Sequence, residues 1–178
     1  MEKLLILDID ETLIHATAER LERDCDFETS WYFVYKRPFL DEFLSFCFSN
    51  FRVAIWTSAG EEFAEEIVKS VIEKHGTPEF LWSNQKCTPR FNPETFETVP
   101  VKNLDKVKNK GFHLDYVIMV DDTPEKLSKH YGNLVRVKEY TGQEEDSELK
   151  ILMGFLSYLK GVQSVRKIEK RGWQRNYT

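Results

Sequence analysis

The stretch that decides the fold lies near the N-terminus, where a short apolar run is interrupted by two acids. It reads Leu4-Leu5-Ile6-Leu7-Asp8-Ile9-Asp10-Glu11-Thr12-Leu13-Ile14. Four consecutive apolar residues bounded by polar ones are typical of a buried strand. Residues two apart in an extended chain point to the same side, so Asp8 and Asp10 are expected to face one spot. Two neighbouring carboxylates cost electrostatic free energy unless a cation or a proton lies between them. The pair therefore predicts a magnesium site, and with it a nucleophile and its proton carrier.

Length and composition predict a single domain over residues 1–178 with its own core. Of the 178 residues, 41% are hydrophobic and 13% are aromatic. The formal charge of −5 argues against a protein that binds nucleic acid by its bulk charge. Basic residues crowd positions 166–178, which we interpret as a solvated tail and as the only place where nucleic acid could bind.

The cysteines and the apolar runs bear on the cellular compartment. Cys25, Cys47 and Cys87 show no metal-ligand spacing, and Cys47 lies in an apolar run typical of a core. Only four apolar residues precede Asp8, too few for a secretory signal, and no run approaches the length of a membrane span. We expect a soluble intracellular protein, cytoplasmic or, in a eukaryote, nuclear, with no membrane partner. The sequence leaves its oligomeric state open.

Short apolar runs alternate with helical patterns, which predicts an α/β fold with a central parallel sheet and flanking helices. The expected strands cover residues 4–8, 31–36, 52–57, 80–83, 116–121 and 134–137, of which 31–36 fits a hairpin or an insert equally well. Helices are expected from Pro38, from Glu61 to Gly76 and over 147–161, with Thr123 as the N-cap of a further turn. We expect a loop over 15–30 and, because of its four prolines, an irregular insert over 77–101.

Reactive side chains follow three of the expected strands. In open parallel sheets, ligands bind beyond the carboxyl ends of the strands. Asp8 ends the first of these strands, Thr57-Ser58 the second and Asp121-Asp122 the third. One acid after a strand is usually a cap or a turn former, but three such ends on one edge favour a site. Lys102 follows Val101, and its position is only weak evidence because most lysines around it must be solvated.

The chemistry that fits these residues is phosphoryl transfer through a covalent aspartyl phosphate. Asp8 would be the nucleophile, and Asp10 would protonate the leaving group and then deprotonate the attacking water. Asp121 and Asp122 would hold Mg²⁺, and Lys102 would neutralise charge in the transition state. The candidate contacts of the substrate phosphate are Thr12, Thr57, Ser58 and Lys102.

Ordered motifs give the chain a resemblance to a known family. They are Asp8-Ile9-Asp10-Glu11-Thr12-Leu13-Ile14-His15, Lys36-Arg37-Pro38-Phe39-Leu40-Asp41-Glu42-Phe43-Leu44, Ile55-Trp56-Thr57-Ser58-Ala59, Val101-Lys102-Asn103-Leu104 and Val120-Asp121-Asp122-Thr123-Pro124. In this order they resemble the haloacid dehalogenase superfamily. Within it, the chain is similar to the phosphatases of the RNA polymerase II C-terminal domain and their small NLI-interacting-factor-like relatives.

The resemblance implies a three-layer Rossmann-like fold with strand order 5-4-1-2-3 and a small insert instead of a large cap. It implies Asp8 as nucleophile, Asp10 as acid and base, and Mg²⁺ held by Asp8, the Asp10 backbone carbonyl and Asp122. Asn103 and Thr123 replace the family's usual aspartate and serine. Residues 61–100 depart further, with only Cys87 and Arg90 similar to a cysteine and an arginine of the family's insert.

Three functions follow from these observations. The first is a magnesium-dependent phosphatase for phosphoserine or phosphothreonine in a protein or peptide. Its alternative keeps the chemistry but acts on a small phosphorylated metabolite, a nucleotide or a nucleic-acid end. The third is a receiver-like or non-catalytic phosphopeptide-binding module, disfavoured because Asp8 and Asp10 are both present and the motif order is wrong for a receiver. The aromatic run Trp31, Tyr32, Phe33 and Tyr35 would either line a peptide site or pack inside the protein.

Overall fold

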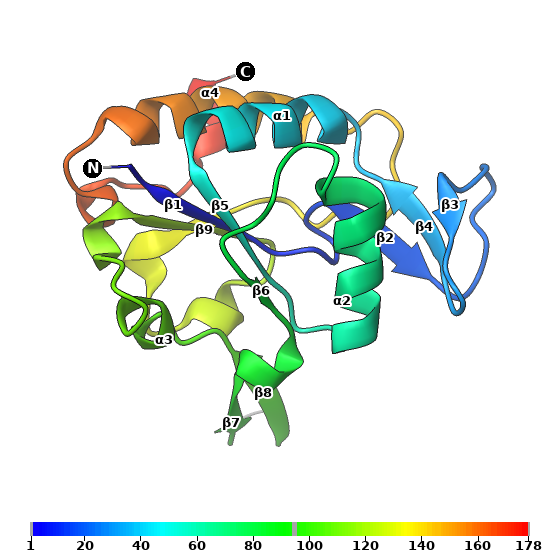
Figure 1. The fold of residues 1–178 in the computed structure, drawn as a ribbon, viewed down its shortest axis with the longest axis horizontal. Coiled ribbons are helices and arrows are strands. Elements are labelled where there is room, and N and C mark those ends of the chain that lie inside the picture. Colours follow the sequence, from blue (N-terminus) through cyan, green and yellow to red (C-terminus); the bar gives the residue numbers. More distant parts are fainter. Residues whose placement is uncertain (1, 94–95, 178) are drawn as a thin grey trace.

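The computed structural model describes residues 2–93 and 96–177, and its centre is a five-stranded parallel sheet (Figure 1). Its strands are β1 (Leu4–Leu7), β5 (Arg52–Trp56), β6 (Leu81–Trp82), β9 (Val117–Asp121) and β10 (Leu134–Arg136). They lie in the order β10-β9-β1-β5-β6 and are all paired in parallel. Counted along the chain, this is the predicted order 5-4-1-2-3, so the fold class is confirmed.

Strand β1 lies in the middle of the sheet and contributes to the core on both of its faces. Leu5 and Leu7 belong to one cluster of buried side chains, whereas Leu4 and Ile6 belong to the other, as the alternation of a strand requires. The first cluster lies under α1 (Leu40–Asn50), α2 (Glu61–Ile67) and α4 (Glu148–Gly161). The second lies under α3 (Asp105–Lys108) and its neighbouring loops, on the other side of the sheet (Figure 1).

The helices confirm the expected patterns, with shifted ends. Helix α1 begins at Leu40 instead of Pro38 because Phe39 adopts a left-handed φ of 65°. Helix α2 continues as a π-helical turn, η1 (Val68–Ile72), and α4 covers the expected range. The further turn is the 3₁₀ helix η4 (Pro124–Leu127), and Thr123 lies at its N-cap position as predicted. Its hydroxyl does not cap the turn, because it donates to Asp122 Oδ2 at 2.8 Å. Two more 3₁₀ turns flank β9 and β10, namely η3 (Leu114–Tyr116) and η5 (Tyr131–Asn133).

The expected loop over residues 15–30 was wrong in part. It contains most of β2 (Ile14–Thr17) and all of β3 (Phe27–Glu28), which pair on either side of β4 (Phe33–Lys36) in a small antiparallel sheet. Only Ile14 of β2 is buried, so the apolar signal of a strand is missing there. In the aromatic run, Tyr35 packs inside the protein, whereas Trp31 is 76% exposed. A role of the run in a peptide site stays a prediction.

The insert over 77–101 is not irregular, contrary to expectation. It contains β6, the 3₁₀ turn η2 (Asn84–Lys86), and a hairpin of β7 (Thr88–Asn92) and β8 (Glu97–Val101). Pro89 and Pro100 lie opposite each other in this hairpin. A two-stranded ribbon consists only of edges, where a missing N–H is tolerated, so prolines do not exclude strands here.

The basic C-terminal segment packs onto the fold, so its interpretation as a solvated tail was wrong. It contains η6 (Val165–Lys167) and η7 (Trp173–Asn176). Trp173 is 2% exposed, stacks on Phe155 with ring centroids 5.2 Å apart, and donates from Nε1 to the Arg136 carbonyl at 2.8 Å. The buried Lys170 amine donates to the carbonyls of Gly132, Val165 and Ile168. In the described ranges, no helix has the length and apolar character needed to cross a membrane.

Candidate active site

Asp8 lies directly after β1 at the carboxyl edge of the sheet, with its side chain fully buried. Its N–H donates to the Val120 carbonyl at 3.0 Å, which fixes the backbone against β9. Lys102 Nζ lies 2.7 Å from Asp8 Oδ1, close enough for an ion pair although not aligned as a hydrogen bond. Lys126 Nζ lies 3.4 Å from Asp8 Oδ2. The carboxylate therefore lies between two ammonium groups.

Asp121 ends β9 and shares Lys102 with Asp8. Lys102 Nζ donates to Asp121 Oδ2 at 2.6 Å, and the N–H of Thr123 donates to Asp121 Oδ1 at 2.9 Å. Burial, followed by the charge of Asp8, raises the pKa of Asp121 to about 6, although both lysines act in the opposite direction. Burial lowers the pKa of Lys102, but Asp121 and Asp8 raise it more, so this lysine stays charged.

Asp122 completes a cluster of three acids suited to a metal ion. One carboxylate oxygen each from Asp8, Asp121 and Asp122 lie within 4.8 Å of one another. Asp122 accepts hydrogen bonds from Thr12 Oγ1 at 3.3 Å and Thr123 Oγ1 at 2.8 Å. Buried Asp8 Oδ1 accepts no hydrogen bond from any residue that the structure describes. Three hard oxygen donors, one of them without a hydrogen bond, fit Mg²⁺.

Asp10 lies beside this cluster and not within it. Thr57 Oγ1 donates to Asp10 Oδ2 at 3.0 Å, and the N–H of Ala59 donates to the same hydroxyl at 2.9 Å. Burial and the charge of Asp8 raise the pKa of Asp10 above its usual value, which suits a group that must carry a proton. Ser58 Oγ is buried and has no hydrogen-bond partner among the described residues.

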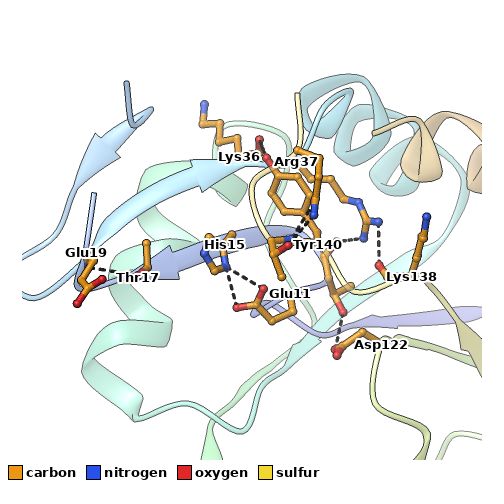
Figure 2. A network of polar contacts seen from close by, with 12 residues as sticks. Glu11, His15, Thr17, Glu19, Lys36, Arg37, Asp122, Lys138 and Tyr140 are labelled. Carbon is orange, nitrogen blue, oxygen red and sulfur yellow. Dashed lines mark hydrogen bonds and ion pairs between the residues drawn. The ribbon is translucent and has the colours of Figure 1, made fainter. Parts of the chain in front are cut away.

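The turn after Asp10 is held from outside the active site (Figure 2). Glu11 has a left-handed φ of 58°, which is costly for a residue with a side chain. Its carbonyl accepts the N–H of Tyr140 at 2.8 Å, and its carboxylate lies 2.9 Å from His15 Nδ1. These contacts keep the turn in a shape that brings Asp8 and Asp10 to the same edge.

Arg37, next to the start of α1, is 1% exposed and braces the same turn (Figure 2). Its guanidinium donates to the carbonyls of Thr12 at 3.0 Å and Lys138 at 2.8 Å. Two further bonds of 2.9 Å join it to the Asp146 carboxylate, just before α4. One side chain thus connects the turn after Asp10, the segment after β10 and the start of the last helix.

The structure brings the predicted candidates together: Asp8, Asp10, Thr12, Thr57, Ser58, Lys102, Asp121 and Asp122 all lie at the carboxyl ends of the strands or on the turns that follow them. Sequence reasoning missed Lys126, although its position four residues after Asp122, in the turn that Pro124 opens, was a usable signal. It quoted Arg37 as part of a motif without giving it a role. The partners of that arginine are more than a hundred residues away, apart from Thr12.

A parallel sheet in this order, with acids at its carboxyl edge, agrees with the fold that the resemblance to the haloacid dehalogenase superfamily implies. The chain belongs to the NLI interacting factor-like phosphatase family, whose model matches residues 3–166. It is 29% identical over 169 residues to "CTD small phosphatase-like protein 2" of Dictyostelium discoideum, covering 91% of this chain and 28% of that protein. It is 26% identical over 176 residues to "Nuclear envelope morphology protein 1" of Schizosaccharomyces pombe, covering 93% of this chain and 35% of that protein.

Among solved structures, the fold is similar to that of Fcp1, described as an essential RNA polymerase II CTD phosphatase. The TM-score is 0.58 at 19% identity, over 93% of this chain and 51% of that one. At this identity the similarity supports the fold alone. The chain spans between 28% and 50% of the length of the first three curated relatives.

Proposed function

We propose that the chain is a magnesium-dependent phosphomonoester hydrolase that works through an aspartyl phosphate on Asp8. The observation that carries this proposal is the pairing of a buried, lysine-flanked Asp8 with a second acid, Asp10, whose pKa is raised. Different environments for two neighbouring carboxyl groups suit the different roles of nucleophile and proton carrier.

The reaction has two steps. An oxygen of Asp8 attacks the phosphorus while the bond to the ester oxygen breaks, and Asp10 donates a proton to the departing alkoxide. Asp10 then takes a proton from a water molecule, whose oxygen attacks the phosphorus and releases phosphate and the Asp8 carboxylate. The same carboxyl group thus donates a proton first and accepts one later.

Other residues would bind the phosphate and offset its charge. Lys102 and Lys126 provide two positive charges beside Asp8, and the hydroxyls of Thr12, Thr57 and Ser58 are the candidate hydrogen-bond donors. The loss of one such group commonly reduces the rate by about 10²- to 10³-fold.

A metal ion would be held by carboxylates at the centre of this edge. Asp8, Asp121 and Asp122 form the cluster, and the Asp10 backbone carbonyl is a further candidate ligand. Bound Mg²⁺ would neutralise charge between the nucleophile and the phosphate dianion.

The substrate we favour is phosphoserine or phosphothreonine in a protein, because relatives of this chain are named as CTD phosphatases. The insert contains a two-stranded hairpin instead of a large cap domain, which is consistent with a polypeptide substrate. We propose one catalytic domain over residues 1–178, located inside the cell, where three unpaired cysteines would stay reduced.

The test uses Asp8→Asn and Asp10→Asn with an aryl phosphate and Mg²⁺, and exposed Asp24→Asn as the matched control. Asp8→Asn should show no turnover, and Asp10→Asn should accumulate phosphate on Asp8. EDTA should stop hydrolysis of the aryl phosphate by the unaltered protein. Label on any other residue would refute the nucleophile assignment. Faster turnover of a metabolite panel than of phosphopeptides would replace the proposed substrate class.

A further inference from the structure

A large groove lies between β10 and the C-terminal segment, next to the active site. We call it the tail groove; residues 132, 134 and 136–139 line one wall and residues 166–174 the other, and its volume is about 1240 Å³. Pockets for small molecules usually measure about 300–1,000 Å³, so this space suits a longer ligand. Pro124, two residues after Asp122, also lines it.

The wall of the tail groove that contains β10 is hydrogen-bonded to β9, the strand that ends at Asp121. The N–H of Val137, in that wall, donates to the Asp121 carbonyl at 3.2 Å. A polypeptide with its phosphorylated residue at Asp8 could therefore continue into the tail groove past Pro124. This continuity makes the groove a candidate for the part of the substrate that flanks the phosphate.

The charge of the tail groove is opposite to that of the whole chain. The chain carries a formal charge of −5, whereas the groove is lined by six cations and three acids. The cations are Arg136, Lys138, Arg166, Lys167, Lys170 and Arg171, and the acids are Glu139, Glu148 and Glu169. Because cations outnumber acids in its lining, the groove should concentrate ligands of negative charge.

Four of these cations have no acidic partner in the part of the chain that the structure describes. Arg136, Lys138, Arg166 and Lys167 are exposed and form no ion pair, in contrast to Arg171, which pairs with Glu169 at 2.7 Å. Cationic side chains that remain unpaired on an otherwise acidic protein are available to a ligand with negative charges.

The walls of the tail groove are fixed before any ligand binds. Trp173 is buried against Phe155, and Lys170 is bonded to carbonyls of both walls, Gly132 near β10 and Ile168 in the tail. A preformed site loses less conformational entropy on binding than a flexible tail would.

We propose that the tail groove binds an acidic segment of the phosphoprotein substrate, next to the residue that is dephosphorylated. This inference rests on the proposed function. A polypeptide is favoured over nucleic acid because three acids interrupt the cations of the groove. A peptide can place neutral residues opposite them, whereas a nucleic acid carries a charge on every nucleotide.

The experiment compares Arg136→Glu/Lys167→Glu with the unaltered protein. Both side chains are exposed and lie outside the proposed catalytic set. The matched control is Lys69→Glu/Lys110→Glu, which makes the same charge change at exposed positions outside the groove. Substrates are an aryl phosphate and two phosphoserine peptides, one with an acidic flank and one with a neutral flank.

The acidic phosphopeptide should lose about tenfold or more in kcat/KM in the groove variant, and this loss should shrink at high salt. The aryl phosphate and the neutral peptide should be unaffected, and the control should retain its preference for the acidic flank. An equal loss on both peptides, or no loss on the acidic one, would overturn the inference.

A binding assay keeps the inference separate from the proposed function. Anisotropy of a labelled acidic peptide without phosphate should show binding to the unaltered protein and about tenfold weaker binding to Arg136→Glu/Lys167→Glu. If the aryl phosphate is not hydrolysed but this difference is seen, the proposed function fails and the groove assignment stands. Equal binding to both proteins, or tighter binding of a single-stranded oligonucleotide of equal charge, would overturn the peptide assignment.

Discussion

Replacing Arg37 by Met should be among the most destabilising single changes on the fold. The substitution removes the ion pair to Asp146 and the donors to the carbonyls of Thr12 and Lys138. The Asp146 side chain is only 10% exposed, so water can solvate its carboxylate only poorly once the Arg37 guanidinium is removed. Breaking a buried ion pair from one side typically costs about 3–5 kcal/mol. We expect the free energy of unfolding to fall by about that amount.

An exposed pair of the same geometry provides the control. Arg52 donates two hydrogen bonds to Glu79, at 2.8 and 2.7 Å, but the two side chains are 43% and 34% exposed. Pairs of this kind usually contribute about 0–1 kcal/mol. Arg52→Met should therefore cost no more than about 1 kcal/mol, although the lost contacts look alike.

Urea unfolding followed by circular dichroism measures both variants, with equal m-values required for the comparison. Adding Asp146→Asn to Arg37→Met should recover part of the loss, because it neutralises the unpaired carboxylate and keeps an oxygen to accept the N–H of Glu148. If Arg37→Met costs no more than Arg52→Met, burial does not govern the contribution of this arginine and the reasoning is wrong.

Three further predictions concern the active site and the core. In the metal-free protein, the raised pKa of Asp121, about 6 against 3.8, means that the folded state binds a proton more tightly between about pH 4 and 6. The free energy of unfolding should therefore fall as pH rises through that window, and Asp121→Asn should weaken this dependence in urea titrations. Thr57→Val removes a hydrogen bond that lowers the pKa of Asp10, so the limb of the pH–kcat profile that reports Asp10 should move to higher pH; an unmoved limb would contradict the contact. Trp173→Ala should cost about 3–5 kcal/mol in unfolding free energy, and a loss below about 1 kcal/mol would show that the C-terminal segment is not part of the core.

The central sheet and most of the candidate site could be predicted because they depend on local patterns. A strand covered on both faces, such as β1, is an uninterrupted apolar run, and the polar residues after it mark where the sheet ends. Asp8, Asp121 and Thr57 each follow such a run, so their meeting at one edge required only the parallel order of the strands.

The peripheral strands could not be predicted in the same way. Only the first residue of β2 is buried, and β7 and β8 carry prolines, so neither segment shows the apolar alternation of a half-buried strand. Their pairing depends on the chain folding back on itself. Proline has a low strand propensity, so Pro89 and Pro100 argue against strands from sequence alone. Both strands of the ribbon are edge strands, where a missing N–H is tolerated.

Long-range partners account for the remaining errors. Lys170 resembles any lysine of a basic tail until the carbonyls that surround its amine are known. Trp173 resembles a terminal aromatic until it is placed against Phe155, eighteen residues earlier in the chain. The residues next to Lys170 and Trp173 in the sequence therefore do not predict the buried surroundings of either side chain.

The packed C-terminal segment also affects how copies of the chain can meet. An outer strand normally presents unpaired backbone groups to which another chain can add, which is a common route to aggregation. In β10 the carbonyl of Arg136 accepts a hydrogen bond from the indole of Trp173, and just before β10 the carbonyl of Gly132 accepts one from the amine of Lys170. Another molecule would have to displace these side chains before it could extend the sheet there. The C-terminal segment should therefore hinder self-association through the β10 edge of the sheet.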